Sequence, residues 1–468
     1  MVVGELTQET DLLIIGGGPG GYSAAFSAAA HGISTTIVEA TPALGGTCLH
    51  VGCIPSKTLL AMAEVMHLAD GAKQYGLDYA PPKVNLEAMR AWKKQVVDRL
   101  AKGLESQCKK FGVERIKGKA VFEDSRHVTI SGGDVSRIKF KQAIIATGSV
   151  PIRLRGIEID SPRVVDSTGA LELSDIPKTL LVIGGGYIGL ELGSVYSALG
   201  SEVTVVEMTE GLLPGVDTDL ARPLVKKLEK EFKEIRLSTK VTGMKNGDKA
   251  IEVLFDGANV PKTKTFDRVL VSVGRKPNSA DLGLANTKVQ VDQRGFVTID
   301  DQLRTNDPKI FAIGDVAGEP MLAHKAIHEG RVAADVIAGK DIAYDRRAVP
   351  AVVFTDPEIA WCGLTETQAK AQNIAYEVKK VQWPASGRAV SIGRTDGLTK
   401  ILFDPKTQRI LGMGLVGPHV GEMIAEGVLA MEMAATATDI ATTIHPHPTL
   451  SETIGDAAFA MLGGAAGH

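Results

Sequence analysis

The sequence predicts an α/β protein with two Rossmann-like dinucleotide-binding domains and a C-terminal α+β domain. Three observations support this fold class. Near the N-terminus a short apolar strand leads into a glycine-rich turn and an Ala-rich helix, and the same pattern recurs 168 residues later (184 − 16). After about Val349 strands and helices continue, but no third glycine-rich turn follows. Such turns between a strand and a helix are typical of doubly wound sheets that bind dinucleotides.

The composition indicates a globular protein that does not bind nucleic acid. Of its 468 residues, 44% are hydrophobic and 23% are charged, and the net charge of −3 comes with no basic run. Four cysteines are too few for a disulfide scaffold and suit a reducing compartment, so we expect a cytoplasmic protein. No apolar stretch is long enough for a membrane span, and the acidic segment Met1–Thr10, which lacks arginine, is unlike a signal or transit peptide.

The first βαβ unit ends at Glu39. Asp11–Ile15 is a predicted strand, the helix after the turn extends to about His31, and Thr35–Val38 is the second predicted strand. Glycines in the turn let a pyrophosphate approach the helix N-terminus, and an acid after the second strand receives ribose hydroxyls. The residues in these positions are Gly16, Gly18, Gly21 and Glu39.

Two cysteines follow this unit. Cys48 and Cys53 lie five positions apart, and Cys48 is expected in the loop that includes Gly45–Thr47, where the chain can bend back. A helix is predicted from Pro55 to about Ala69, because proline suits a first helical turn, and Cys53 near its positive end would favour the thiolate. We interpret the pair as a redox-active disulfide. Two core cysteines are the alternative, and zinc is disfavoured because no second cysteine pair exists.

The second βαβ unit repeats the first. Thr179–Ile183 and Val203–Val206 are predicted strands, and Glu207 lies 168 residues after Glu39 (207 − 39). One such motif often marks only a tight turn, but two complete copies with one offset indicate two dinucleotides. A carboxylate at this position repels a 2′-phosphate, and residues 207–215 contain no arginine, so we expect NAD rather than NADP. The glycines of this copy are Gly184, Gly186 and Gly189.

Each unit has a later apolar segment that ends in small residues. Ala143–Gly148 follows the first unit and Val269–Gly274 the second, and both are predicted to end at the ligand-binding edge of a sheet. Ile310–Asp315 is a further predicted strand with an acid at its C-terminal end. Asp315 is therefore a candidate ligand-binding residue, and an ordinary helix cap is the alternative.

The C-terminal third is predicted to form an α+β domain with a dimerisation surface. Its predicted elements are the strands Ala351–Phe354, Ala375–Val381 and Leu398–Phe403 and a helix from Val420 to about Ala435. Near its end, His445–Glu452 contains two histidines beside prolines and an acid that can orient an imidazole. We interpret this segment as a base with a carboxylate partner. A structural surface loop fits the local sequence equally well.

These motifs together resemble one protein family along nearly the whole chain. Gly45–Lys57, with the sequence GGTCLHVGCIPSK, resembles the redox-disulfide segment of the flavin-dependent disulfide reductases. The two glycine motifs, Ala146–Gly148, Gly314–Asp315, Met321–Lys325 and His447–Glu452 fall in that family's order. The resemblance implies bound FAD, bound NAD and a homodimer.

The resemblance also divides the chain and assigns cofactor-binding residues. Residues 1–150 and 281–348 would bind FAD, residues 151–280 NAD, and residues 349–468 would form the dimerisation domain. FAD would contact Gly16, Gly18, Gly21, Glu39, Gly46, Thr47, Lys57, Ala120, Gly148, Asp315, Met321, Leu322, Ala323 and His324. NAD would contact Gly184, Gly186, Tyr187, Gly189, Glu207, Val241 and Gly274, with Tyr187 either a gate over the nicotinamide or a packing aromatic.

The activity implied by the resemblance is the oxidation of protein-bound dihydrolipoamide to lipoamide with reduction of NAD⁺. The expected partner is a lipoyl domain of a 2-oxoacid dehydrogenase core or a glycine cleavage carrier protein. Cys53 would face the flavin and Cys48 the substrate, and His447 would act as the base in the partner subunit's site. The implied catalytic set is Cys48, Cys53, Lys57 paired with Glu191, and His447 oriented by Glu452, with no metal.

The chain departs from the family at His50, where asparagine is usual. A neutral spacer and an influence on thiolate titration are both open for this imidazole. Cys108 and Cys362 are expected to be structural. A glutathione reductase-like enzyme is an alternative, although such enzymes prefer NADP and use arginine near the second glycine motif. A mainly scaffolding or electron-carrier component is another alternative.

Overall fold

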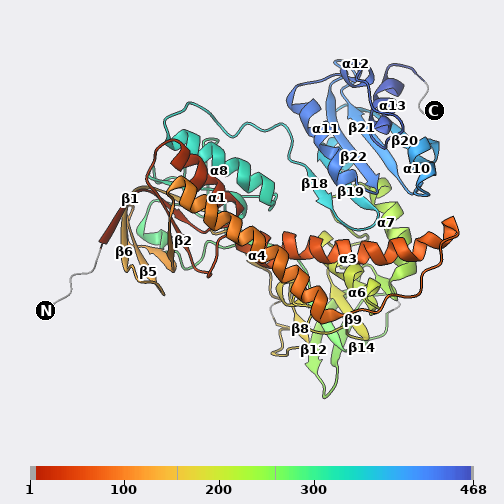
Figure 1. Ribbon diagram of the computed structural model, residues 1–468, viewed down its shortest axis with the longest axis horizontal. Coiled ribbons are helices and arrows are strands. Elements are labelled where there is room, and N and C mark those ends of the chain that lie inside the picture. The colour runs from red at the N-terminus through yellow and green to blue at the C-terminus, as the bar shows by residue number, and fades with distance from the viewer. Residues whose placement is uncertain (1–6, 155, 259, 465–468) are drawn as a thin grey trace. The chain divides into compact units, whose positions relative to one another are not determined.

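Figure 1 shows a computed structural model of the chain, which describes residues 7–154, 156–258 and 260–464. The first six residues of the Met1–Thr10 segment lie outside the described residues. The chain divides into two compact units. The first comprises the chain up to Leu59, Asn85–Ile152 and Gly274–Asp345, and the second comprises Leu60–Val84, Arg153–Val273 and the chain from Arg346.

The first unit is built on a seven-stranded sheet. Its strand order is β3 (Glu114–Lys117), β2 (Thr35–Glu39), β1 (Thr7–Ile15), β6 (Arg137–Ile145), β5 (His127–Ser131) and β4 (Lys119–Phe122), with β17 (Ile310–Ala312) also beside β6. The strands β1, β2, β3, β6 and β17 are parallel. Their carboxyl ends therefore meet at one edge, which is where an open parallel sheet binds its ligand.

Helices flank this sheet and approach one another at glycines. They are α1 (Pro19–Ala30), α2 (Gly46–Val51), the start of α3 (Cys53–Gly71), α4 (Leu86–Phe111) and α8 (Ala323–Ile337). Helices α1 and α8 lie side by side, and a Cβ at Gly330 would lie only 2.5 Å from the carbonyl oxygen of Gly20. The short strands β7 (Ser149–Pro151) and β16 (Arg275–Pro277) form an antiparallel pair in this unit.

The second unit contains a parallel sheet that carries the second glycine motif. Its strand order is β11 (Glu234–Arg236), β10 (Glu202–Val206), β9 (Thr179–Ile183), β15 (Arg268–Val271) and β8 (Val164–Val165). Its helices are α5 (Ser167–Leu171), α6 (Tyr187–Ala198) and α7 (Thr218–Glu231). A separate antiparallel sheet consists of β12 (Lys240–Asn246), β13 (Ile251–Asp256) and β14 (Thr263–Phe266).

The C-terminal part of the second unit is an antiparallel sheet with helices, as the α+β prediction requires. The strand order is β18 (Ala351–Val353), β19 (Glu358–Gly363), β22 (Ile410–Gly417), β21 (Leu398–Phe403) and β20 (Glu377–Gln382). The helices are α9 (Glu366–Ala371), α10 (Gly387–Ser391), α11 (Val420–Glu432), α12 (Ala437–Ala441) and α13 (Glu452–Met461). Its core contains the buried Trp383, Phe403 and Cys362.

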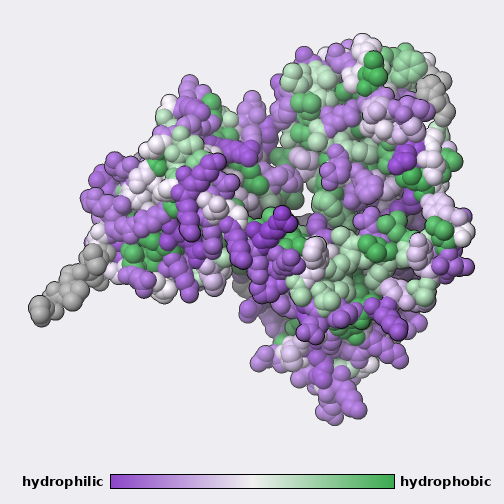
Figure 2. All heavy atoms as spheres, in the orientation of Figure 1, coloured by the Kyte–Doolittle hydropathy of each residue, from purple (hydrophilic) through white to green (hydrophobic). Residues whose placement is uncertain are grey.

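Large apolar side chains remain on the surface of this part. Figure 2 shows patches of hydrophobic residues there among polar ones. The exposed set is Val390, Leu429, Met433, Ile444, Phe459 and Leu462, and Ile444 keeps 95% of its surface. Among the described residues, no helix has the combination of length and apolarity that a membrane span requires.

Several expected boundaries need correction. Cys48 does not lie in a loop, because α2 already begins at Gly46. Helix α3 begins at Cys53, two residues before the predicted start at Pro55. The strand predicted to reach Asp315 ends at Ala312, since Gly314 adopts a φ of 73° and opens a 3-10 turn. Glycine tolerates this left-handed conformation, which ends the regular pairing.

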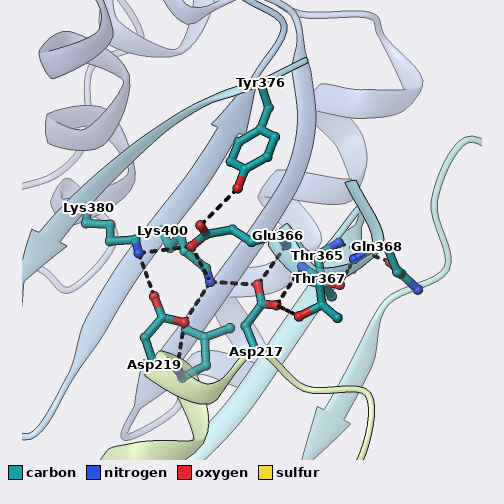
Figure 3. Close-up of polar contacts among 10 residues, drawn as sticks. Asp217, Asp219, Thr365, Glu366, Thr367, Gln368, Tyr376, Lys380 and Lys400 are labelled. Atoms are coloured by element: carbon teal, nitrogen blue, oxygen red, sulfur yellow. Dashed lines mark hydrogen bonds and ion pairs between the residues drawn. The ribbon is translucent and has the colours of Figure 1, made fainter. Parts of the chain in front are cut away.

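A buried ion network joins α7 to the C-terminal sheet (Figure 3). The Lys400 ammonium, only 1% exposed, donates to Asp217 at 2.7 Å, Asp219 at 2.7 Å and Glu366 at 3.1 Å. Lys380 bridges Asp219 and Glu366 from the other side. Burial alone would raise the pKa of Asp217, but hydrogen bonds led by that from Lys400 outweigh it and lower this pKa. The three carboxylates lie close enough to hold a metal ion, but the ammonium already supplies their positive charge.

Replacing Lys400 with methionine should destabilise the second unit by about 3–5 kcal/mol, because it leaves buried carboxylates uncompensated. Urea unfolding measures the loss. Lys139→Met is the matched control, since its pair with Glu9 is exposed and worth at most about 1 kcal/mol. Because the folded pKa of Asp217 is lowered, the network stabilises the protein at neutral pH and loses this effect as the pH falls through that pKa. Equal losses in both variants would contradict the prediction.

Candidate active site

The first glycine turn is held by Glu39, the last residue of β2. Its carboxylate accepts from the Gly17 N–H at 2.7 Å through Oε2, and from the N–H and hydroxyl of Thr41 at 2.8 and 2.9 Å through Oε1. Gly16 has a φ of 106°, and a Cβ there would lie 2.3 Å from the Ala146 carbonyl oxygen. Glycine is therefore required where β1 and β6 end side by side.

The second copy reproduces this geometry residue by residue. Glu207 Oε2 accepts from the Gly185 N–H at 2.7 Å, and Oε1 accepts from the N–H and hydroxyl of Thr209 at 2.8 and 2.9 Å. Gly184 has a φ of 107°, and its Cβ would lie 2.3 Å from the Ser272 carbonyl oxygen. The repeat of 168 residues thus extends from the motif to its hydrogen bonds.

Both helices that follow these turns fit the phosphates of a dinucleotide. Helix α1 begins after Gly18 and helix α6 after Gly186, and neither residue can cap its helix with a side chain. A Cβ on Gly186 would meet no atom within 4 Å, and one on Gly18 would meet only Gly46 at 3.9 Å. Neither helix thus has a capping side chain at its N-terminus, which leaves N–H groups of the kind that bind an anion.

Most of the other predicted FAD residues border the carboxyl edge of the first sheet. Asp315 accepts from the Ser149 hydroxyl at 2.6 Å, one residue after Gly148. Ala120 lies buried on β4, two residues after Gly118, whose N–H donates to the Glu39 carbonyl at 2.9 Å. Met321 and Leu322 lead into α8, which begins with Ala323 and His324 and has no capping side chain.

The two cysteines come together although they lie on different helices. Cys48 is in α2 and Cys53 begins α3, with a break at Gly52. Both are free thiols, Cys48 half-buried and Cys53 exposed. The hydrogen bond with Cys53, and next burial, raise the pKa of the Cys48 thiol, while the Lys57 ammonium opposes this rise. Cys48 is thus the half-buried sulfur whose pKa is raised, and Cys53 is the exposed one, so the two sulfurs are unequal.

The helix that carries Cys48 touches the first glycine turn. A Cβ on Gly46 would lie 2.7 Å from the Cα of Gly18. Gly46 thus packs directly against the turn that precedes α1. Tyr22 on α1 lies near both cysteines. Burial first, and then the two thiols, raise the pKa of its phenol.

Of the two histidines in the His445–Glu452 segment, His447 has a ring nitrogen that no described residue bonds. Its Nδ1 bonds the Glu452 carboxylate at 2.8 Å, and no described residue bonds its Nε2, on a side chain that is 72% exposed. His445 instead bonds Glu426 through Nε2 at 2.8 Å and the Thr443 carbonyl through Nδ1 at 3.0 Å. Local sequence does not separate these two histidines.

The remaining predicted residues are distributed over both units. Glu191 is 2% exposed on α6 and accepts from the Phe354 N–H at 2.9 Å. Val241 is buried on β12, and Tyr187 opens α6 with 38% of its surface exposed. Lys57 and Gly274 belong to the first unit. Cys108 and Cys362 are buried, as expected for structural cysteines.

Sequence reasoning missed several residues that hold the site. Thr41 and Thr209 fix the two acids, and their shared spacing of two residues after each acid could have revealed them. Lys325 and Glu329, both almost fully buried, pair at 2.8 Å, and Glu329 accepts from the Gly314 N–H at 2.6 Å. Nothing in the local sequence marks this pair as a support for the turn before Asp315.

Known proteins share this chain's sequence and fold. Dihydrolipoyl dehydrogenase of Haemophilus influenzae is 47% identical over 96% of this chain and 94% of its own length. That of Geobacillus stearothermophilus is 43% identical, over 99% and 98%. The solved structure of LpdA from Mycobacterium tuberculosis has a TM-score of 0.90 at 28% identity, covering 97% of this chain and 99% of that one.

Two family patterns cover nearly the whole chain. The pyridine nucleotide-disulphide oxidoreductase pattern matches residues 10–330, and the dimerisation domain of the same family matches residues 349–458. The C-terminal sheet and the exposed Leu429, Met433 and Ile444 lie within the second match, which supports a homodimer. The chain belongs to the pyridine nucleotide-disulphide oxidoreductase family.

Proposed function

We propose that the chain oxidises protein-bound dihydrolipoamide to lipoamide and reduces NAD⁺ to NADH, with FAD as its bound cofactor. The observation that carries this proposal is the contact between two unequal thiols, Cys48 and Cys53, on a helix pair that abuts the first glycine turn. The names of the similar proteins, which are dihydrolipoyl dehydrogenases, support the choice of substrate.

FAD is assigned to the first glycine motif and NAD to the second. Residues 1–150 and 281–348 would form the FAD-binding part, residues 151–280 the NAD-binding domain and residues 349–468 the dimerisation domain. The start of the second family match at residue 349 supports the boundary of the dimerisation domain. The assigned contacts are those of the sequence analysis, from Gly16 to His324 for FAD and from Gly184 to Gly274 for NAD.

The protein's own residues carry the thiol chemistry. His447 Nε2 takes the proton of one substrate thiol, and the resulting thiolate attacks Cys48 Sγ in the oxidised Cys48–Cys53 pair. The Cys48–Cys53 bond breaks and Cys53 leaves as a thiolate. The second substrate thiol then displaces Cys48, which closes the lipoamide disulfide and leaves the protein as a dithiol. When bound, FAD would carry the electron pair from this dithiol to NAD⁺. Lys57 and Glu191 are proposed to pair beside the flavin.

Glu207 should set the preference for NAD over NADP. Glu207→Gln removes the charge that repels a 2′-phosphate, so we expect the ratio of kcat/KM for NAD⁺ to that for NADP⁺ to fall by about tenfold or more. Steady-state rates with each nucleotide give the ratio. Glu39→Gln makes the same change in the first copy and should leave the ratio unaltered while it weakens FAD binding. An unchanged ratio in Glu207→Gln would overturn the NAD assignment of the second copy.

The physiological partner is proposed to be a lipoyl domain of a 2-oxoacid dehydrogenase core or of a glycine cleavage carrier, and the location the cytoplasm. The scarcity of cysteines supports a reducing compartment.

The deciding experiment for the proposed function compares two assays of the purified protein. NADH formation from dihydrolipoamide and NAD⁺ is expected. Oxidation of NADPH by glutathione disulfide would instead favour the glutathione reductase-like alternative, and failure of both would favour a scaffolding or electron-carrier role.

A further inference from the structure

His50 lies between the two cysteines in sequence, and its ring bonds the chain that precedes them. The Nε2 of His50, on α2, lies 2.9 Å from the carbonyl oxygen of Leu44. Because a carbonyl only accepts, Nε2 carries the hydrogen of this bond. The half-buried imidazole thus bridges the helix that bears Cys48 and the turn before that helix.

The peptide group that His50 contacts is held at its other end by the first glycine turn. The amide of the Leu44–Gly45 peptide donates to the Gly17 carbonyl at 2.8 Å. The N–H of Gly17 in turn donates to the Glu39 carboxylate at 2.7 Å. A continuous chain of three hydrogen bonds therefore runs from the His50 ring to the acid of the first βαβ unit.

Comparison with the second βαβ unit shows which of these three hydrogen bonds occurs only in the first unit. There the Leu213 N–H donates to the Gly185 carbonyl at 2.9 Å, and Gly185 donates to Glu207. The position of His50 is taken by Thr218, and within the described residues no side chain bonds the Leu212 carbonyl. The hydrogen bonds from this peptide to the glycine turn, and from the turn to the acid, occur in both copies. Only the copy with cysteines adds a hydrogen bond from an imidazole.

We propose that His50 is a positioning residue that fixes the cysteine-bearing helix α2 against the glycine turn assigned to FAD. This inference rests on the proposed function. It predicts that the N–H of residue 50, rather than its ability to titrate, holds the cysteine pair and the cofactor turn in register. A glutamine, which presents an N–H at similar reach, should therefore replace the histidine.

The test compares His50→Leu, which keeps the volume but removes the donor, with His50→Gln. We expect FAD to dissociate about threefold to tenfold faster from the leucine variant and within about twofold of the wild-type rate from the glutamine variant, as for loss and retention of one hydrogen bond. The thiolate–flavin charge-transfer band of the reduced protein should weaken in the leucine variant alone. Binding of NADH should not change in either, because the second copy lacks this contact.

A leucine variant that matches the wild type, or a glutamine variant as impaired as the leucine variant, would overturn the inference. Nitrogen NMR of the unmutated protein provides a test independent of folding in the variants. It should show the hydrogen of neutral His50 on Nε2, and finding it on Nδ1 would equally refute the proposal. None of these readouts uses dihydrolipoamide turnover, so they remain informative even if the proposed substrate is wrong.

Discussion

Replacing Cys48 with serine should abolish the reduction of NAD⁺ by dihydrolipoamide while FAD stays bound. Serine cannot form the disulfide that the substrate thiolate attacks, and without a bond to break no electron pair enters the protein. We expect kcat to fall by at least about 10³-fold, since an essential nucleophilic group is removed. NADH formation under saturating substrate measures the loss, and the flavin absorbance of the purified variant reports cofactor content.

The structural cysteine Cys362 provides the control for this experiment. Cys362→Ala removes a sulfur that is buried in the C-terminal core, where burial raises the pKa of the thiol to about 12. That variant should keep its turnover number and lose only stability, by about 1–2 kcal/mol for the small cavity. Retention of substantial lipoamide activity in Cys48→Ser would remove the cysteine pair from the reaction.

The parts of the site predicted well from sequence are those with a local physical signal. The glycine turns were recognisable because the motif is local to one strand–turn–helix segment, where a Cβ on Gly21 would lie 1.9 Å from the Gly16 carbonyl oxygen. Strand β9 has the predicted bounds because its buried apolar run ends directly at the second glycine turn. The pairing of His447 with Glu452 spans only five residues and was likewise expected.

The parts that sequence could not predict depend on contacts between distant segments or on ambiguous residues. Gly45 and Gly46 indicated a loop, yet glycine also tolerates the conformation that precedes a helix, and α2 starts there. The Ser149–Asp315 hydrogen bond joins residues 166 positions apart. The burial of Lys400 among carboxylates follows from the packing of α7 against the sheet, which charge pattern alone does not reveal.

Replacing His447 with glutamine should lower kcat/KM for dihydrolipoamide by about 10²–10⁴-fold, the usual contribution of a general base. Glu452 stands at the N-terminus of α13, where the helix dipole favours its charge, and it also accepts from the Thr449 N–H at 2.7 Å. The carboxylate is thereby fixed and directs the Nδ1–H of His447 toward itself. Nε2 is left as the nitrogen that takes the proton. Glutamine fills similar space and can bond Glu452, but it cannot accept a proton from a thiol.

His445→Gln is the matched control, because both nitrogens of His445 already face oxygen acceptors within 3.0 Å. That variant should stay within about threefold of the wild-type rate, in contrast to the loss expected of a general base.

A pH profile separates a base from a merely structural residue. A base must be unprotonated to act, so the wild-type pH profile should show an acid limb, and this limb should disappear in His447→Gln. If His445→Gln proves the more damaging change, or if the acid limb persists without His447, the base lies elsewhere. The ring of His447 is exposed and belongs to the matched dimerisation domain, so we expect it to act in the site of the partner subunit. A subunit that carries only Cys48→Ser should therefore restore activity to a His447→Gln subunit. In such a mixed dimer, one site keeps both the cysteine pair and the histidine.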